Sequence, residues 1–125
     1  MATGAKRVLV VDDEPGFTEM VKLSLEQAGG YVVREENDAA RAVATARQFM
    51  PHLILLDVMM PDMDGGDVAR ALSREPELAN VPVVYLTALV SQAESPASSQ
   101  HRYLPKPASM AELVDAVRST MDAGA

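Results

Sequence analysis

The chain alternates short apolar runs with longer segments of helical periodicity, and this alternation constrains its fold more than any other feature. Runs with the length of a strand lie at residues 8–11, 31–36, 53–56 and 81–87, and a fifth, very short run lies at 103–104. The runs at 8–11 and 53–56 are apolar throughout, which is typical of strands buried on both faces. Five strand and helix units in alternation predict an α/β fold in which helices cover both faces of a parallel sheet.

Signals for the ends of helices lie between the first runs. Gly29 and Gly30 can stop a helix that begins near Pro15, since glycine readily adopts the backbone conformation that follows a helix. Asn37 or Asp38 can cap the alanine-rich segment that comes next. We therefore expect one helix between the first and second strands and another directly after the second strand.

The last two helical units are unequal. Ser109 and Glu112 have the spacing of a capping box, in which each side chain bonds the other residue's backbone N–H, and an apolar helical face follows them. Residues 91–100, by contrast, hold four serines, one proline and only two apolar residues, both alanine. We expect the fourth helix to be short or irregular.

The composition indicates one acidic domain without cysteine chemistry. The 125 residues include 11 Lys and Arg, 18 Asp and Glu and no Cys, which gives a net charge of −7. We expect a single domain over residues 1–125, with a core from about 6 to 121. Direct contact with nucleic acid is not expected, because it requires a clustered basic surface. Apolar stretches fall far short of the roughly 20 residues that span a bilayer, so we expect a soluble, cytoplasmic protein with no membrane partner.

Polar and charged side chains follow four of the five predicted strands. They are Asp12 and Asp13 after the first, Asp57 after the third, Thr87 at the end of the fourth and Lys106 after the fifth. The carboxyl ends of the strands of an open parallel sheet line its functional crevice. Carboxylates that converge there repel one another, and a hard cation such as Mg²⁺ compensates them. The set predicts a magnesium site suited to phosphoryl transfer onto a carboxylate.

Asp57 is the predicted nucleophile, because it follows the most apolar strand and so lies deepest and most rigidly placed. Asp12 and Asp13 would then bind the metal or anchor its ligands. Thr87 and Lys106 would contact phosphoryl oxygens. Each has an ordinary structural alternative: acidic residues favour helix N-termini, and a threonine at a strand end or a surface lysine is common.

Four short segments occur in order along the chain. They are Val-Val-Asp-Asp-Glu-Pro at 10–15, Leu-Asp-Val-Met-Met-Pro-Asp-Met-Asp-Gly at 56–65, Leu-Thr-Ala at 86–88 and Tyr-Leu-Pro-Lys-Pro at 103–107. Together, at this spacing, they resemble the receiver domain of bacterial two-component response regulators. The resemblance covers residues 6–121 and implies a flavodoxin-like, doubly wound, five-stranded parallel sheet in strand order 2-1-3-4-5.

The resemblance also implies how the site works. Asp57 would accept a phosphoryl group from a histidine kinase or a phosphotransfer protein. The implied Mg²⁺ ligands are Asp12, Asp13, Asp57 and the backbone carbonyl of Met59. Thr87 and Lys106 would bind the phosphoryl group, and a cis peptide is expected between Lys106 and Pro107.

Tyr103 matches the aromatic residue that turns inward when the Thr87 hydroxyl moves to the phosphate, although ordinary packing of a half-buried tyrosine is the alternative. The switch would change the surface seen by a downstream protein effector or by a second copy of the chain. The positions that orient or exclude the hydrolytic water in the family are Met59 and Leu89 here, and neither is polar, so slow self-dephosphorylation is expected.

Two other functions remain open at this point. The same fold could serve as a binding module that never uses phosphate, although the full set of site residues argues against this. A flavin carrier or small hydrolase is a different class, but Asp-Asp-Glu-Pro at 12–15 repels phosphate unless a metal intervenes. The chain could be a stand-alone receiver or a fragment of a longer regulator, and its start at Met1 slightly favours the former.

Overall fold

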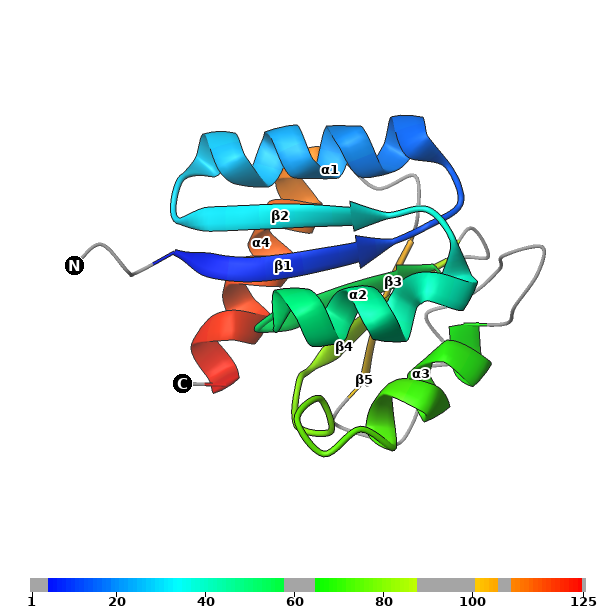
Figure 1. The fold of residues 1–125 in the computed structure, drawn as a ribbon. Coiled ribbons are helices and arrows are strands. Elements are labelled where there is room, and N and C mark those ends of the chain that lie inside the picture. Colours follow the sequence, from blue (N-terminus) through cyan, green and yellow to red (C-terminus); the bar gives the residue numbers. More distant parts are fainter. Residues whose placement is uncertain (1–4, 58–64, 88–100, 106–108, 125) are drawn as a thin grey trace.

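The computed structural model describes residues 5–57, 65–87, 101–105 and 109–124 (Figure 1). The strands are β1 (Lys6–Val11), β2 (Tyr31–Glu36), β3 (Leu53–Asp57), β4 (Val83–Thr87) and β5 (His101–Pro105). The helices are α1 (Pro15–Ala28), the 3-10 turn η1 (Ala39–Arg41), α2 (Ala42–Phe49), α3 (Gly65–Ser73) and α4 (Met110–Gly124). The segment predicted to hold a short or irregular fourth helix, 91–100, lies outside the described residues.

The strands form a parallel sheet in the order β2-β1-β3-β4-β5. The predicted α/β class with a parallel sheet is confirmed. β2, which includes Arg34, Glu35 and Glu36, lies at an edge, and β3, which is apolar until its acidic last residue, lies at the centre. Within the described ranges, every helix is too short or too polar to cross a membrane.

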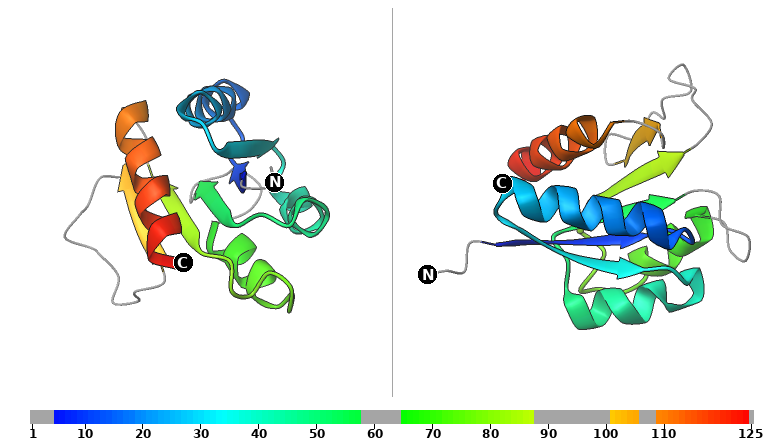
Figure 2. Two further views of the ribbon diagram at one scale, coloured as in Figure 1. Left: turned by 90° about the vertical axis from the view of Figure 1, so that its left-hand side faces the viewer. Right: turned by 90° about the horizontal axis from the view of Figure 1, so that it is seen from above.

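Helices cover both faces of the sheet (Figure 2). α1 and α4 pack on one face and α2 and α3 on the other, so each face carries its own apolar cluster. β3 serves both clusters, because successive side chains point to opposite faces: Leu53 and Leu55 face α1 and α4, whereas Ile54 and Leu56 face α2 and α3. All four side chains are fully buried. This explains why β3 is an uninterrupted apolar run.

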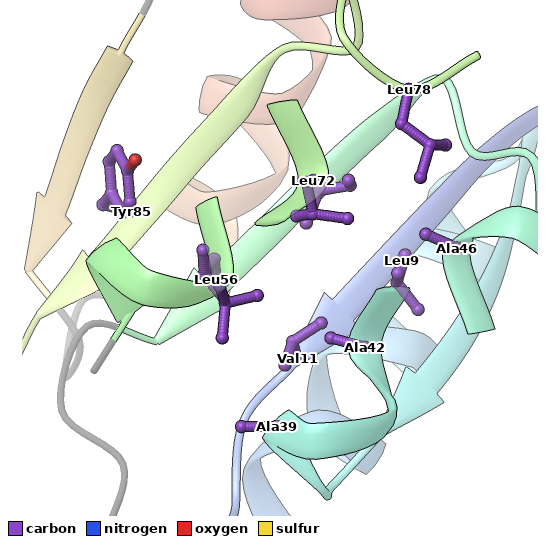
Figure 3. Close-up of a cluster of buried hydrophobic side chains, with 11 residues drawn as sticks. Leu9, Val11, Ala39, Ala42, Ala46, Leu56, Leu72, Leu78 and Tyr85 are labelled. Atoms are coloured by element: carbon purple, nitrogen blue, oxygen red, sulfur yellow. The ribbon is translucent and has the colours of Figure 1, made fainter. Parts of the chain in front are cut away.

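The alanine-rich sequence of α2 suits its place over β1. Ala42 and Ala46 are fully buried and lie in the same cluster as Leu9 and Val11 of β1 (Figure 3). A methyl group is the smallest apolar side chain, so the larger strand residues fill the space between helix and sheet. Alanine on the buried face of α2 thus lets the helix pack closely against β1.

Side chains of α1 cover part of the free edge of β2. The backbone N–H of Val33 donates to Glu26 Oε2 (3.1 Å), and the Val33 carbonyl accepts from Lys22 Nζ (3.3 Å). Lys22 and Glu26 also form an ion pair at 3.2 Å. The hydrogen bond from Val33 lowers the pKa of Glu26, and the Lys22 charge contributes in the same direction. The edge strand is therefore tied to the helix that follows β1.

Two predicted strand boundaries differ from the observed ones. The fourth strand begins at Val83 rather than 81, because Pro82 has no N–H to donate, although its carbonyl still accepts from the Ile54 N–H (3.0 Å). β5 is longer than the predicted 103–104, since its backbone pairs with β4 over the full length of that strand. The observed strand begins at His101, two residues before the predicted run.

Helix ends follow the predicted signals closely. Ser109 Oγ accepts the Glu112 N–H (3.2 Å) at the start of α4. Asp38 caps the turn η1, ahead of α2, by accepting the Ala40 N–H (3.0 Å). α1 stops at Gly29, whose φ of 91° suits glycine.

Candidate functional site

Two carboxylates stand side by side where the central strands end. The register pairs Val11 of β1 with Leu56 of β3, so the next residues, Asp12 and Asp57, are neighbours at the carboxyl edge of the sheet. Asp13 follows directly. One carboxylate oxygen from each of the three lies within 4.8 Å of the others. The structure brings together the three acids that the sequence placed at these strand ends.

The three carboxylates differ in their exposure. Asp12 is 0% and Asp57 is 2% exposed, whereas Asp13 faces solvent. Two acids held out of water next to a third solvent-facing one can receive a cation from the solvent side. Asp57 is the last residue of a strand whose other members are fully buried, which fixes its backbone firmly. This is the placement expected of a nucleophile that must meet its substrate in one orientation.

Asp12 is held by hydrogen bonds on three of its groups. Its backbone N–H donates to the Glu36 carbonyl (3.1 Å) and extends the ladder between β1 and β2. Its carboxylate Oδ1 accepts the backbone N–H of Glu14 (2.9 Å). Its carbonyl accepts from Asn37 Nδ2 (2.8 Å). The loop that carries the first two acids is thus fastened to β2 as well as to α1.

The charge of the cluster fits a hard divalent cation. Two ionised carboxylates at 4.8 Å repel by about 3 kcal/mol at an effective dielectric near 20. Mg²⁺ prefers carboxylate oxygen and water ligands, which the two buried acids and the exposed Asp13 can supply together. The residues present therefore fit the ion that the sequence predicted.

For the other predicted site residues, the structure describes either the backbone position alone or nothing. Thr87 is the last residue of β4, at the same edge of the sheet as Asp57. The backbone of Tyr103 lies in β5, opposite Tyr85 of β4. Met59, Leu89 and Lys106 lie outside the described residues, as does the peptide bond between Lys106 and Pro107. Their roles stay predictions.

His52 lies just before β3, at the opposite end of the sheet from the acidic cluster. Its Nδ1 accepts the backbone N–H of Arg7 (2.9 Å). The Arg7 guanidinium donates through Nε to the carbonyls of Phe49 (3.0 Å) and Met50 (2.8 Å), where α2 ends. Burial lowers the pKa of His52, and the positive charges of Arg7 and Lys6 lower it further.

Sequence reasoning missed the part that Asn37 plays. It considered Asn37 only as a helix cap, whereas the structure places its amide on the Asp12 carbonyl and on Thr18 Oγ1 (3.0 Å). A signal was present: Asn37 directly follows β2, whose carboxyl end lies beside that of β1. A polar side chain at that strand end belongs to the same crevice.

Comparisons with known proteins agree with this geometry. The family model described as the response regulator receiver domain matches residues 8–118. The DNA-binding dual master transcriptional regulator RpaA of Synechocystis is 36% identical over 118 residues, which cover 92% of this chain and 48% of that protein. The DNA-binding response regulator MtrA of Mycolicibacterium smegmatis is 36% identical over 124 residues, covering 97% and 53%. The chain thus spans about half the length of the curated relatives it matches.

Solved structures share the fold along nearly their whole length. The chemotaxis protein CheY4 of Vibrio cholerae superposes with a TM-score of 0.83 at 28% identity, covering 93% of this chain and 98% of that one. The receiver domain of the Francisella response regulator 1452 gives a TM-score of 0.80 at 27% identity, covering 96% and 99%. With the acidic cluster at the expected strand ends, these matches show that the chain belongs to the response regulator receiver domain family.

Proposed function

We propose that Asp57 is the phosphoacceptor of this receiver domain and that Asp12 and Asp13 hold the Mg²⁺ it requires. Receiver domains are phosphoacceptor signalling modules of two-component systems. The observation that carries the assignment is the cluster itself: Asp57 is buried at the end of the central strand, within 4.8 Å of oxygens of the other two acids. We also propose that the domain is a single unit over residues 1–125, with its core at about 6–121.

The transfer is a displacement at phosphorus. A carboxylate oxygen of Asp57 attacks the phosphorus of a phosphohistidine, and the new P–O bond forms as the P–N bond breaks. The electron pair of the P–N bond stays on the departing histidine nitrogen, which takes up a proton from water. The buried strand position of Asp57 holds that oxygen in one direction, so little orientational freedom is lost when donor and acceptor meet.

The remaining site residues act on the charge of the phosphoryl group. Asp12, Asp13 and Asp57, together with the backbone carbonyl of Met59 that the resemblance implies, would hold Mg²⁺, and the ion would supply positive charge against the phosphoryl oxygens. We propose that Lys106 pairs with one of these oxygens and that the Thr87 hydroxyl donates to another. Thr87 lies at the end of the strand next to β3, a position that supports this role.

The partners follow from the same chemistry. The donor is a histidine kinase or a phosphotransfer protein, since a phosphoryl group on nitrogen transfers readily to a carboxylate. Movement of Thr87 toward the phosphate, followed by inward rotation of Tyr103, would change the surface that a downstream protein or a second copy of the chain recognises. The domain itself carries a net charge of −7, which disfavours direct contact with DNA.

A phosphorylation assay tests the proposal. The protein is incubated with Mg²⁺ and acetyl phosphate, and its intact mass is measured. We expect one added phosphoryl group in the wild type and none in Asp57→Ala. Asp38→Ala is the control and should also gain one phosphoryl group, because the Asp38 carboxylate caps η1 and does not belong to the acidic cluster. Absence of both a mass shift and Mg²⁺ affinity in the wild type would instead favour a binding module that does not use phosphate.

A further inference from the structure

A chain of hydrogen bonds runs from β2 through α1 to the loop that carries Asp12 and Asp13. The Thr18 hydroxyl lies 2.7 Å from Glu35 Oε1, to which it donates, and 3.1 Å from the Pro15 carbonyl. Asn37 Nδ2 donates to Thr18 Oγ1 (3.0 Å) and to the Asp12 carbonyl (2.8 Å). Three elements that are separate in the sequence thus meet behind the acidic cluster.

The direction of each bond in this chain is fixed by chemistry. The Glu35 carboxylate and the Pro15 carbonyl can only accept, so the single hydroxyl hydrogen of Thr18 is donated, with Glu35 the nearer acceptor, and a hydroxyl lone pair is left for Asn37. The Asn37 amide must then present its NH₂ group, whose two hydrogens reach Thr18 and the Asp12 carbonyl. Thr18 is 0% exposed, which shields the middle of the chain from competing water.

This arrangement fixes the two peptide groups that flank Asp13. The peptide before it is held through the Asp12 carbonyl, which Asn37 binds. The peptide after it is held through the Glu14 N–H, which Asp12 Oδ1 binds (2.9 Å). Asp13 faces solvent, so the direction of its Cα–Cβ bond, and with it the set of positions that its carboxylate can reach, depends on these two planes rather than on packing.

We propose that Asn37 and Thr18 are positioning residues for the metal ligands, and that they aim Asp13 at the cation by clamping the Asp12–Asp13 peptide. The inference rests on the proposed Mg²⁺ site and adds residues that touch neither the metal nor the phosphoryl group. Partners that orient ligands in this way typically change metal affinity by about 10- to 100-fold when removed.

The chain offers a matched control in Thr45. Thr45 is 4% exposed and its hydroxyl donates to Glu36, so it resembles Thr18 in burial and in having a carboxylate partner. Thr45 binds the side chain of Glu36, whereas Glu36 holds the Asp12 N–H through its backbone carbonyl. The described contacts do not connect Thr45 to Asn37 or to the Asp12 carbonyl. A valine at either position removes one buried hydroxyl and retains the shape of the side chain.

The experiment measures Mg²⁺ binding by titration calorimetry, and unfolding by urea, in the intact chain. Asn37→Ala and Thr18→Val are expected to weaken Mg²⁺ binding by about tenfold, whereas Thr45→Val leaves the affinity within about twofold despite a similar loss of stability. Thr18→Ser keeps the hydroxyl and is expected to bind Mg²⁺ as the wild type does. Asn37 is exposed, so its alanine variant still folds.

Each result decides the proposal. Equal weakening by Thr18→Val and Thr45→Val would overturn it, because general destabilisation would then explain the effect. Unchanged affinity in Asn37→Ala would overturn it as well, while leaving the proposed Mg²⁺ site intact. A wild type that binds no Mg²⁺ would remove the proposed function together with this inference.

Discussion

Replacement of Asp57 by asparagine should stabilise the metal-free protein. Asp57 and Asp12 are both buried, and their carboxylate oxygens approach within 4.8 Å. At this distance two ionised carboxylates repel by about 3 kcal/mol when the effective dielectric is near 20. Asparagine has the shape of aspartate without its charge, so Asp57→Asn removes this repulsion while retaining the packing. A gain of about 3 kcal/mol corresponds to a rise in melting temperature of roughly 10 °C for a domain of this size.

Thermal unfolding in the presence of a chelator measures the effect, with Asp38→Asn as the control. Asp38 is also acidic but is exposed and lies outside the cluster, so its replacement should move the melting temperature little. Added Mg²⁺ should reverse the order, because it binds the folded wild type and raises its stability more than that of Asp57→Asn. An unchanged or lower melting temperature of metal-free Asp57→Asn would show that the carboxylates are not strained together.

Three further outcomes follow from other parts of the molecule. The phosphorylated protein should lose its phosphoryl group slowly, because Met59 and Leu89, the positions that the family resemblance assigns to control of the hydrolytic water, have apolar side chains; a half-life of seconds in the purified protein would refute this. The pKa of His52 is lowered, so the folded protein binds fewer protons there than the unfolded chain. Its contribution to stability should therefore be complete above the ordinary histidine pKa of about 6.5 and decline as the pH falls below that value; urea unfolding across this range should show a smaller decline in His52→Gln. Met50→Gly should raise the free energy of unfolding by about 1 kcal/mol, because Met50 closes α2 at a φ of 53°, where a side chain is strained; a decrease in urea unfolding experiments would contradict this.

The order of elements could be predicted because the core runs are unambiguous. Residues 53–56 are apolar at every position, and the structure buries each of them, since β3 faces a helical layer on both sides. The capping role of Ser109 could also be predicted, because a capping box depends only on residues that are neighbours in sequence. An apolar run and a capping box each depend on a few consecutive residues, so both can be recognised in the sequence without knowledge of the fold.

The extent of β5 and the role of Asn37 could not be read in the same way. The sequence predicted strand only at 103–104, and the strand conformation of His101 comes from pairing with Val83 of β4. Asn37 has the residue type of a helix cap, but Asp38 takes that role and leaves the amide free to bind the Asp12 carbonyl. Both features depend on which strands become neighbours, and this is decided only when the chain has folded.

The side chains of α1 that bind the backbone of Val33 bear on what the sheet can recruit. An added strand beside β2 would need that N–H and carbonyl, in the middle of β2, for its hydrogen-bond ladder, yet Glu26 and Lys22 already bind them. The added strand would have to displace the Glu26 carboxylate and the Lys22 ammonium group before it could form hydrogen bonds with Val33. Continuous pairing along this edge, whether into a strand-swapped pair or a fibril, therefore costs these interactions.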